Sequence, residues 1–117
     1  MNVKSIPPKR SNHQNSPEII ELMHELENAT LAKDREKEIY IFLLLAKAYI
    51  GIHEFASASL MAETSLELAQ KIDHKEFELS SLEMLGLLYT KSTRDTTKIV
   101  KGVDYLRQAV SLVREMG

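Results

Sequence analysis

The strongest constraint on this chain is an internal repeat with a period of about 40 residues. Residues 26–50, LENATLAKDREKEIYIFLLLAKAYI, align with residues 66–90, LELAQKIDHKEFELSSLEMLGLLYT. Seven aligned positions are identical: Leu26/Leu66, Glu27/Glu67, Ala29/Ala69, Glu36/Glu76, Glu38/Glu78, Leu45/Leu85 and Tyr49/Tyr89. A repeat of this length predicts that similar units of secondary structure stack side by side.

Apolar residues recur at three- and four-residue steps in both copies, which is the spacing of an α-helix. A first helix is predicted over residues 17–33, with Ser16 as its cap and proline at its first position. Asp34 can cap a second helix, which ends around Gly51. A third helix begins near Glu54.

Two further helices complete the pattern. Asp73 and Glu76 have the spacing of a capping box, so they predict the start of a fourth helix. The polar segment KSTRDTTK, residues 91–98, follows as a loop lengthened by four residues. A fifth helix ends at Gly117 and is marked by Ile99, Val103, Leu106, Val110 and Val113. Five helices without a hairpin pattern predict an all-α fold.

The segment 39–52, IYIFLLLAKAYIGI, contains a single charge, Lys47, and allows three interpretations. A membrane-spanning helix needs about 20 apolar residues, so this segment is too short, and charged sequences flank it. A buried strand fits its run of Ile, Tyr and Phe, because a short apolar run has no diagnostic period. The position of the segment inside a helical repeat favours a helix that is packed on several sides.

Composition fits one soluble domain, with 44% apolar and 27% charged residues among 117. Residues 1–16 lack an apolar pattern and are expected to form a flexible tail, which leaves a single domain over residues 17–117. The chain has no cysteine, which excludes disulfides, thiolate metal sites and cysteine nucleophiles. This suits a reducing compartment, and without a signal peptide we expect a cytoplasmic protein.

The charge distribution disfavours nucleic acid and membrane surfaces as partners. Residues 1–16 carry three cations and no acid, so the rest of the chain has a formal net charge of −5. An acidic domain does not attract phosphate backbones or anionic headgroups. A protein or peptide partner is therefore expected.

No group of residues suggests an enzyme, a cofactor site or a metal site. The sequence HELEN at residues 24–28 begins like a zinc-protease helix, but Asn28 stands where the second histidine ligand belongs. The acidic pairs Glu36/Glu38 and Glu76/Glu78 are spaced by two positions, which puts the two carboxylates on different helix faces. With only four glycines and no phosphate-binding loop, we expect a protein without catalytic activity.

Large and small residues alternate in a pattern that suits close packing of helix pairs. Phe42 aligns with Leu82, and Ala46 aligns with Gly86, so that residue size is kept. The residues predicted to pack inside the repeats are Phe42, Leu45, Ala46, Tyr49 and Ala58 in the first copy, and Leu82, Leu85, Gly86, Tyr89 and Ala109 in the second. The second helix of each pair offers Ala58, Ala62 and Ser65 in one copy, and Gly102, Leu106 and Ala109 in the other.

This pattern resembles the tetratricopeptide repeat (TPR) family, in particular its long-period members such as kinesin light chain and bacterial regulators. The resemblance covers residues 17–117, with the first helix as the second half of an incomplete leading repeat. It implies a right-handed stack of antiparallel helix pairs. The period exceeds the usual value of about 34 residues and also suits HEAT or armadillo repeats, although neither predicted first helix contains the proline that those repeats favour.

The resemblance implies a concave groove that binds a protein or a peptide. Its residues would be Tyr40, Leu43, Leu44, Lys47, Ile50, Glu83, Met84, Leu87 and Lys91, with Ser80 and Thr90 beside them. The same apolar residues could instead be core, and the chain could serve as the sensor or regulatory part of a transcription or signalling system. A carboxylate clamp is not expected, because only Lys47 and Lys91 could contribute to it. The last helix lacks a polar cover, which predicts self-association, for example as a homodimer.

Overall fold

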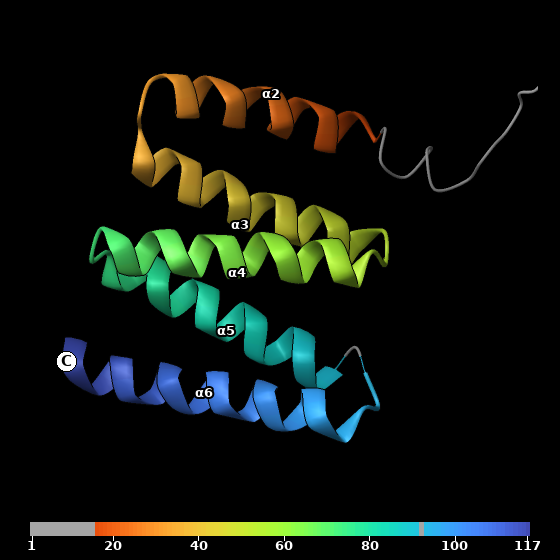
Figure 1. The fold of residues 1–117 in the computed structure, drawn as a ribbon, viewed down its shortest axis with the longest axis vertical. Coiled ribbons are helices and arrows are strands. Elements are labelled where there is room, and N and C mark those ends of the chain that lie inside the picture. Colours follow the sequence, from red (N-terminus) through yellow and green to blue (C-terminus); the bar gives the residue numbers. More distant parts are fainter. Residues whose placement is uncertain (1–15, 92) are drawn as a thin grey trace, which may run out of the picture.

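The chain folds into a row of antiparallel helices, as a computed structural model that describes residues 16–91 and 93–117 establishes (Figure 1). The helices are α2 (Pro17–Leu31), α3 (Arg35–Gly51), α4 (Phe55–Lys71), α5 (Lys75–Lys91) and α6 (Thr96–Met116). These residues contain no strand, so the all-α prediction is confirmed, and the apolar segment 39–52 lies almost entirely in α3. Of the predicted tail, all but Ser16 lies outside the described residues.

The starts of α2 and α3 follow the sequence signals in part. The Asp34 carboxylate accepts a hydrogen bond from the Lys37 N–H at 3.2 Å, as expected of a helix cap. Pro17 occupies the first position of α2, but the Ser16 side chain makes no capping bond. Instead, the Ser16 carbonyl accepts from the Ile20 N–H at 2.9 Å. Ser16 therefore occupies the N-cap position, as predicted, but without a capping bond from its side chain.

The start of α5 differs from the predicted capping box. His74, not Asp73, caps this helix, because the His74 Nδ1 atom accepts a hydrogen bond from the Phe77 N–H at 3.2 Å. The His74 and Phe77 rings also stack, with their centroids 4.3 Å apart. Asp73 lies in the left-handed backbone region with a φ of 56°, which directs the chain into the turn before the helix.

The three connections between α2 and α5 repeat one backbone geometry at evenly spaced positions. Lys33, His53 and Asp73 all have positive φ angles, of 58°, 61° and 56°. The N–H of each donates to the carbonyl group three positions earlier, at 3.1, 3.0 and 3.2 Å. This turn ends α2 at Leu31, earlier than the predicted residue 33. Helices of 17 residues joined by these short turns therefore account for the period of the repeat.

Three of the four extra residues before the last helix extend that helix, and one lengthens the connection. The connection comprises only residues 92–95, and α6 begins at Thr96 with Asp95 as its cap. The helix has 21 residues, one turn more than the 17 of α4. The predicted lengthening of the loop is therefore correct for one residue only, because Asp95, whose carboxylate accepts from the Thr97 N–H at 2.9 Å, starts the helix before Ile99.

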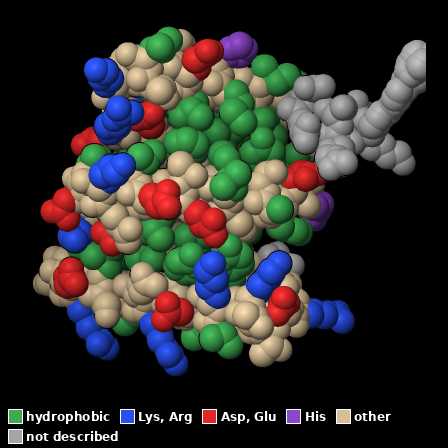
Figure 2. Space-filling model, viewed as in Figure 1, with side chains coloured by type: hydrophobic (Ala, Val, Ile, Leu, Met, Phe, Trp, Pro, Cys, Tyr) green, Lys and Arg blue, Asp and Glu red, His purple; other side chains and the backbone are tan. Residues whose placement is uncertain are grey.

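Each helix packs mainly against its neighbours in sequence, and α3 also contacts α5. Apolar side chains lie between α2 and α4 and between α4 and α6 in Figure 2. The residues predicted to pack inside the repeats are all buried or partly buried: Phe42, Leu45, Ala46, Tyr49, Ala58, Leu82, Leu85, Gly86, Tyr89 and Ala109. No helix among the described residues is both long and apolar enough to cross a membrane.

Two glycines let α5 and α6 approach closely. A Cβ atom added to Gly86 would lie 2.4 Å from Leu106 Cδ2, and one added to Gly102 would lie 2.9 Å from Tyr89 Cβ. The Gly102 Cβ position is also only 3.1 Å from the Gly86 carbonyl oxygen, so backbone faces backbone here. The helix pair depends on the absence of side chains at both positions.

A polar contact recurs in both copies of the repeat. The Thr30 hydroxyl of α2 donates to the buried Glu38 carboxylate of α3 at 2.8 Å, and the Gln70 amide of α4 donates to Glu78 of α5 at 3.4 Å. Arg35 also donates to Glu38, at 2.6 Å. Burial opposes the charge on Glu38, but the hydrogen bonds from Arg35 and Thr30 and the charge of Arg35 outweigh it and lower the pKa of the carboxyl group.

Candidate functional site

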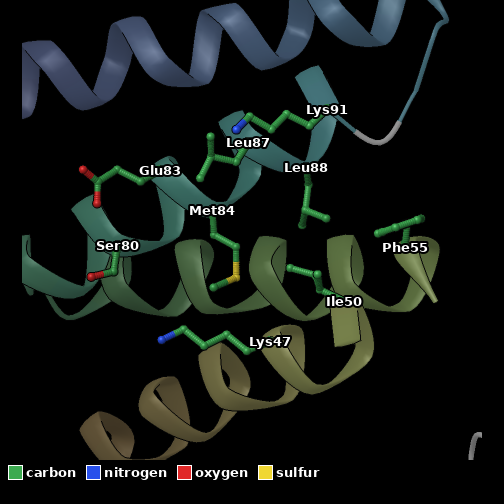
Figure 3. A pocket seen from close by; sticks show the side chains of 9 residues that line it. All are labelled: Lys47, Ile50, Phe55, Ser80, Glu83, Met84, Leu87, Leu88 and Lys91. Atoms are coloured by element: carbon green, nitrogen blue, oxygen red, sulfur yellow. The ribbon is translucent and has the colours of Figure 1, made fainter. Parts of the chain in front are cut away.

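A cavity of about 580 Å³ lies between α3 and α5 and is open to solvent (Figure 3). Its lining is mostly apolar, with three charged side chains. The lining residues are Lys47 and Ile50 from α3, Phe55 from α4, and Ser80, Glu83, Met84, Leu87, Leu88 and Lys91 from α5. Below, this is called the α3–α5 cavity. Its size is in the range of small-ligand pockets and of grooves for a few side chains of a peptide.

Helical periodicity brings most of these residues to one face. On α5, Ser80, Met84, Leu87 and Lys91 recur at steps of three and four positions, so their side chains lie along one side of the helix. Met84 extends from α5 towards α3 in Figure 3. This row gives the cavity a continuous wall about three turns long.

Phe55 closes one end of the cavity from a different helix. It is the first residue of α4, so the short turn after α3 carries it back beside Ile50. Its ring makes an edge contact with the His53 ring, at 5.8 Å between centroids and an angle of 75°. The left-handed backbone of His53 therefore helps to fix an aromatic wall of the cavity.

Six of the nine predicted groove residues line this cavity: Lys47, Ile50, Glu83, Met84, Leu87 and Lys91. Leu87 is the most accessible of the apolar ones, with 49% of its surface exposed. The structure thus brings together residues from both copies of the repeat, as far apart in the sequence as Lys47 and Lys91.

The other three predicted groove residues lie elsewhere. Leu43 is buried with Ile39 and Ala69 in a second core cluster, and Leu44 is partly buried against the main core. Tyr40 is 53% exposed, with its ring 6.5 Å from that of Phe77, and does not line the cavity. For Leu43 the core interpretation of the sequence therefore describes the structure, because α5 covers that side of α3.

Two lining residues escaped the sequence prediction. Neither Phe55 nor Leu88 was among the residues predicted for the groove, although both line the cavity. For Phe55 a signal existed, because a short turn between Ile50 and Phe55 must bring these residues close together. Leu88 could not have been assigned to the cavity from the sequence, because its spacing is the same as that of a core leucine. In the structure it is 4% exposed.

The charges of the cavity lie on flexible side chains around the apolar lining. Lys47 and Lys91 carry two positive charges, and Glu83 carries one negative charge. All three residues are exposed. The balance is positive, so a ligand with an acidic residue beside its apolar anchors would complement this lining.

The described residues show neither a metal-binding cluster nor a buried side-chain nitrogen or oxygen atom without a partner. They contain no group of three or more His, Asp or Glu residues that could hold a metal ion. Every buried side-chain nitrogen or oxygen atom among them has a hydrogen-bond partner.

A separate polar cluster joins α4, α5 and α6. The Tyr89 hydroxyl donates to the Glu63 carboxylate, and the Tyr89 ring stacks on Tyr105 with centroids 5.8 Å apart. The Lys101 ammonium lies 5.2 Å from the centroid of the Tyr89 ring. Burial, the hydrogen bond to Glu63 and the charge of Glu63 raise the pKa of Tyr89 to about 12.

This cluster predicts a loss of stability in alkaline solution. Tyr89 keeps its proton in the folded chain up to a pH of about 12, whereas an unfolded tyrosine ionises near pH 10. The contribution of Tyr89 to stability is therefore complete below pH 10 and decreases between about pH 10 and 12. Absorbance titration of the phenolate should show a late-ionising tyrosine that Tyr89→Phe removes. Titration of all four tyrosines near pH 10 would contradict the contact with Glu63.

Comparisons of this chain with protein-family models, with curated proteins and with solved structures find no match.

Proposed function

We propose that this protein is a non-enzymatic binding module that holds a peptide or helix of a partner protein in the α3–α5 cavity. The observation that carries the proposal is the cavity itself, an open, mostly apolar hollow lined by both copies of the repeat. Apolar anchors that enter such a hollow contribute about 1.5–3 kcal/mol each when fully buried. The surrounding charges would then select the orientation of the ligand.

The TPR-like architecture belongs to the same proposal. Three features support a stack of helix hairpins: the internal repeat, the recurring turns, and the contact of α3 with α5 beyond their sequence neighbours. In such a stack the first helices of successive pairs line one wall. This arrangement fits a cavity whose lining comes mostly from α3 and α5. A HEAT- or armadillo-like scaffold is the alternative architecture.

A role as the sensor or regulatory part of a transcription or signalling system is the second candidate. It uses the same cavity and differs in what the bound segment controls. The absence of cysteine from the sequence suits either role in the cytoplasm.

The proposal can be tested with peptides selected from a displayed library on the purified chain. Leu87→Glu should weaken the selected peptide by at least about tenfold, because it places a charge among the apolar anchors of the ligand. Leu87 is half exposed, so the variant should keep its helical circular dichroism. The variant Leu43→Glu, which the sequence alone would suggest, is unsuitable because Leu43 is core.

The matched control is Leu60→Glu. Leu60 is 57% exposed on α4 and does not line the α3–α5 cavity, so this variant introduces the same charge at a similarly accessible leucine. Binding should be unchanged. If Leu60→Glu and Leu87→Glu weakened the peptide equally, or if neither did, the cavity would not be the binding site.

A further inference from the structure

The helix α6 has a second apolar face that no described element covers. Its inner face, with Gly102, Tyr105, Ala109 and Leu112, packs on α5. The apolar residues that marked this helix in the sequence lie on another side, where Val103, Val110 and Val113 are 39%, 53% and 50% exposed. Together with partly buried Leu106, which borders them and also lies against Gly86 of α5, they form what we call the open face of α6. The apolar stripe therefore predicted the helix, and the small residues Gly102 and Ala109 marked its buried side.

The alignment of the repeats indicates which kind of structural element would contact this face. When Ala58, Ala62 and Ser65 of α4 are aligned with Gly102, Leu106 and Ala109 of α6, Leu66 and Ala69 align with Val110 and Val113. In α4 these two residues are 8% and 0% exposed, and Ala69 forms a core cluster with Ile39 and Leu43 of α3, against which Phe77 and Met84 of α5 pack. The open face of α6 thus corresponds to a face that receives a helix elsewhere in the same molecule.

The alignment of the repeats also gives a role to Arg114, a charged residue of α6. Thr30 of α2 and Gln70 of α4 each donate to a glutamate that is the fourth residue of the following helix, Glu38 or Glu78. The same alignment puts Arg114 at the corresponding place in α6. Arg114 lines a hollow of about 380 Å³ together with Leu106, Val110 and Val113. A guanidinium group at this position suits a carboxylate better than a hydroxyl or an amide does.

We propose that the open face of α6 binds an amphipathic helix of a partner protein, packed as α5 packs on α4, with a glutamate in its first turn that pairs with Arg114. This contact goes beyond the proposed function, because it uses none of the residues of the α3–α5 cavity except Glu83 at its border. At the opposite end of the row, the exposed side of α2 carries Glu18, Glu21 and Glu25 together with Ile20 and Met23, which are each 40% exposed. The exposed apolar residues of α6 lie beside basic Arg114 instead, so this end suits an amphipathic helix with an acidic first turn.

The test uses a synthetic copy of residues 74–91, HKEFELSSLEMLGLLYTK, as the probe helix for the full chain. Fluorescence anisotropy should detect its binding, and Val110→Asp should weaken it by at least about tenfold, because it removes apolar contact and buries a charge. Leu60→Asp is the matched control, since Leu60 is similarly exposed on α4. Lys47→Glu, in the α3–α5 cavity, should leave this binding unchanged even if it alters the peptide of the proposed function.

The charge pair provides a second, independent readout. Arg114→Glu should weaken the probe roughly fivefold, and a probe with Glu78→Lys should then bind the Arg114→Glu chain better than the original probe does. If the probe bound all variants equally, it would be displacing the chain's own α5, and the proposal would fail. It would also fail if light scattering showed a dimer that Val110→Asp converts to a monomer, because a second copy would then cover the face.

Discussion

Replacing Gly86 by leucine should destabilise the fold by about 1–3 kcal/mol, because even a Cβ atom at this position would lie 2.4 Å from Leu106 Cδ2. The added side chain must push α6 away from α5 or force Leu106 out of its rotamer. Either change weakens the contact between Gly86 and Gly102, where the two backbones meet. Chemical denaturation monitored by circular dichroism measures the effect directly.

The matched control for this substitution is Gly51→Leu. Gly51 is also helical, at the end of α3, but no atom lies within 4 Å of a Cβ built on it. We expect a change within about 0.5 kcal/mol for this variant. In the double variant Gly86→Leu with Leu106→Ala, the loss should be smaller than the sum of the single losses, because the clash is removed. An unchanged unfolding midpoint for Gly86→Leu would refute the close helix contact.

Shortening the central leucine of either repeat should cost more, about 2–5 kcal/mol. Leu45 and Leu85 align in the repeat and are both fully buried. Leu45→Ala and Leu85→Ala each remove three carbon atoms from the same core cluster and leave a cavity that rigid helices fill only partly. Because the two positions are equivalent, the two losses of unfolding free energy should be similar.

Leu31→Ala serves as the control for both variants. Leu31 is 77% exposed at the end of α2, so the same truncation should change the unfolding free energy by no more than about 0.5 kcal/mol. If Leu45→Ala were as mild as Leu31→Ala, residue 45 would not be at the centre of the helix pair. If only one of Leu45→Ala and Leu85→Ala were severe, the two repeats would not contribute equally to the core.

Helix number and helix type followed from the sequence because apolar periodicity is a local property. The helix caps were predicted only in part from the local sequence. Asp34 caps α3, as predicted. Asp73 has a left-handed backbone conformation instead, and His74 caps α5. The turn that includes Lys33, which shortened α2, contains no glycine to reveal a positive φ angle. The helix ends were therefore not predicted accurately, because residue preferences alone do not reveal this type of turn.

The side on which each helix is buried was harder to predict, because a stripe of apolar residues does not say which neighbour covers it. Leu43 and Leu87 both looked like groove residues, yet α5 covers Leu43, and Leu87 stays half exposed. On α6 the apolar stripe with Val110 and Val113 faces solvent, while Gly102 and Ala109 make the contact with α5. Small residues carry little hydrophobic signal of their own, so this contact was indicated by the recurrence of small residues in the repeat, at Gly86, Gly102 and Ala109, and not by the apolar stripe.

The regular turns of this fold also restrict which duplications of sequence segments the fold could accommodate. The turns at Lys33, His53 and Asp73 are evenly spaced, so the backbone alone would allow duplication of a single helix with its turn. The polar contact of Glu38 with Thr30, however, recurs only at Glu78 with Gln70, one whole helix pair later. Duplication of a single helix would put a copy of α4 where a helix like α3 or α5 belongs and leave these carboxylates without their donors. Duplication of a whole helix pair would preserve both the turn geometry and the hydrogen bonds to these glutamates.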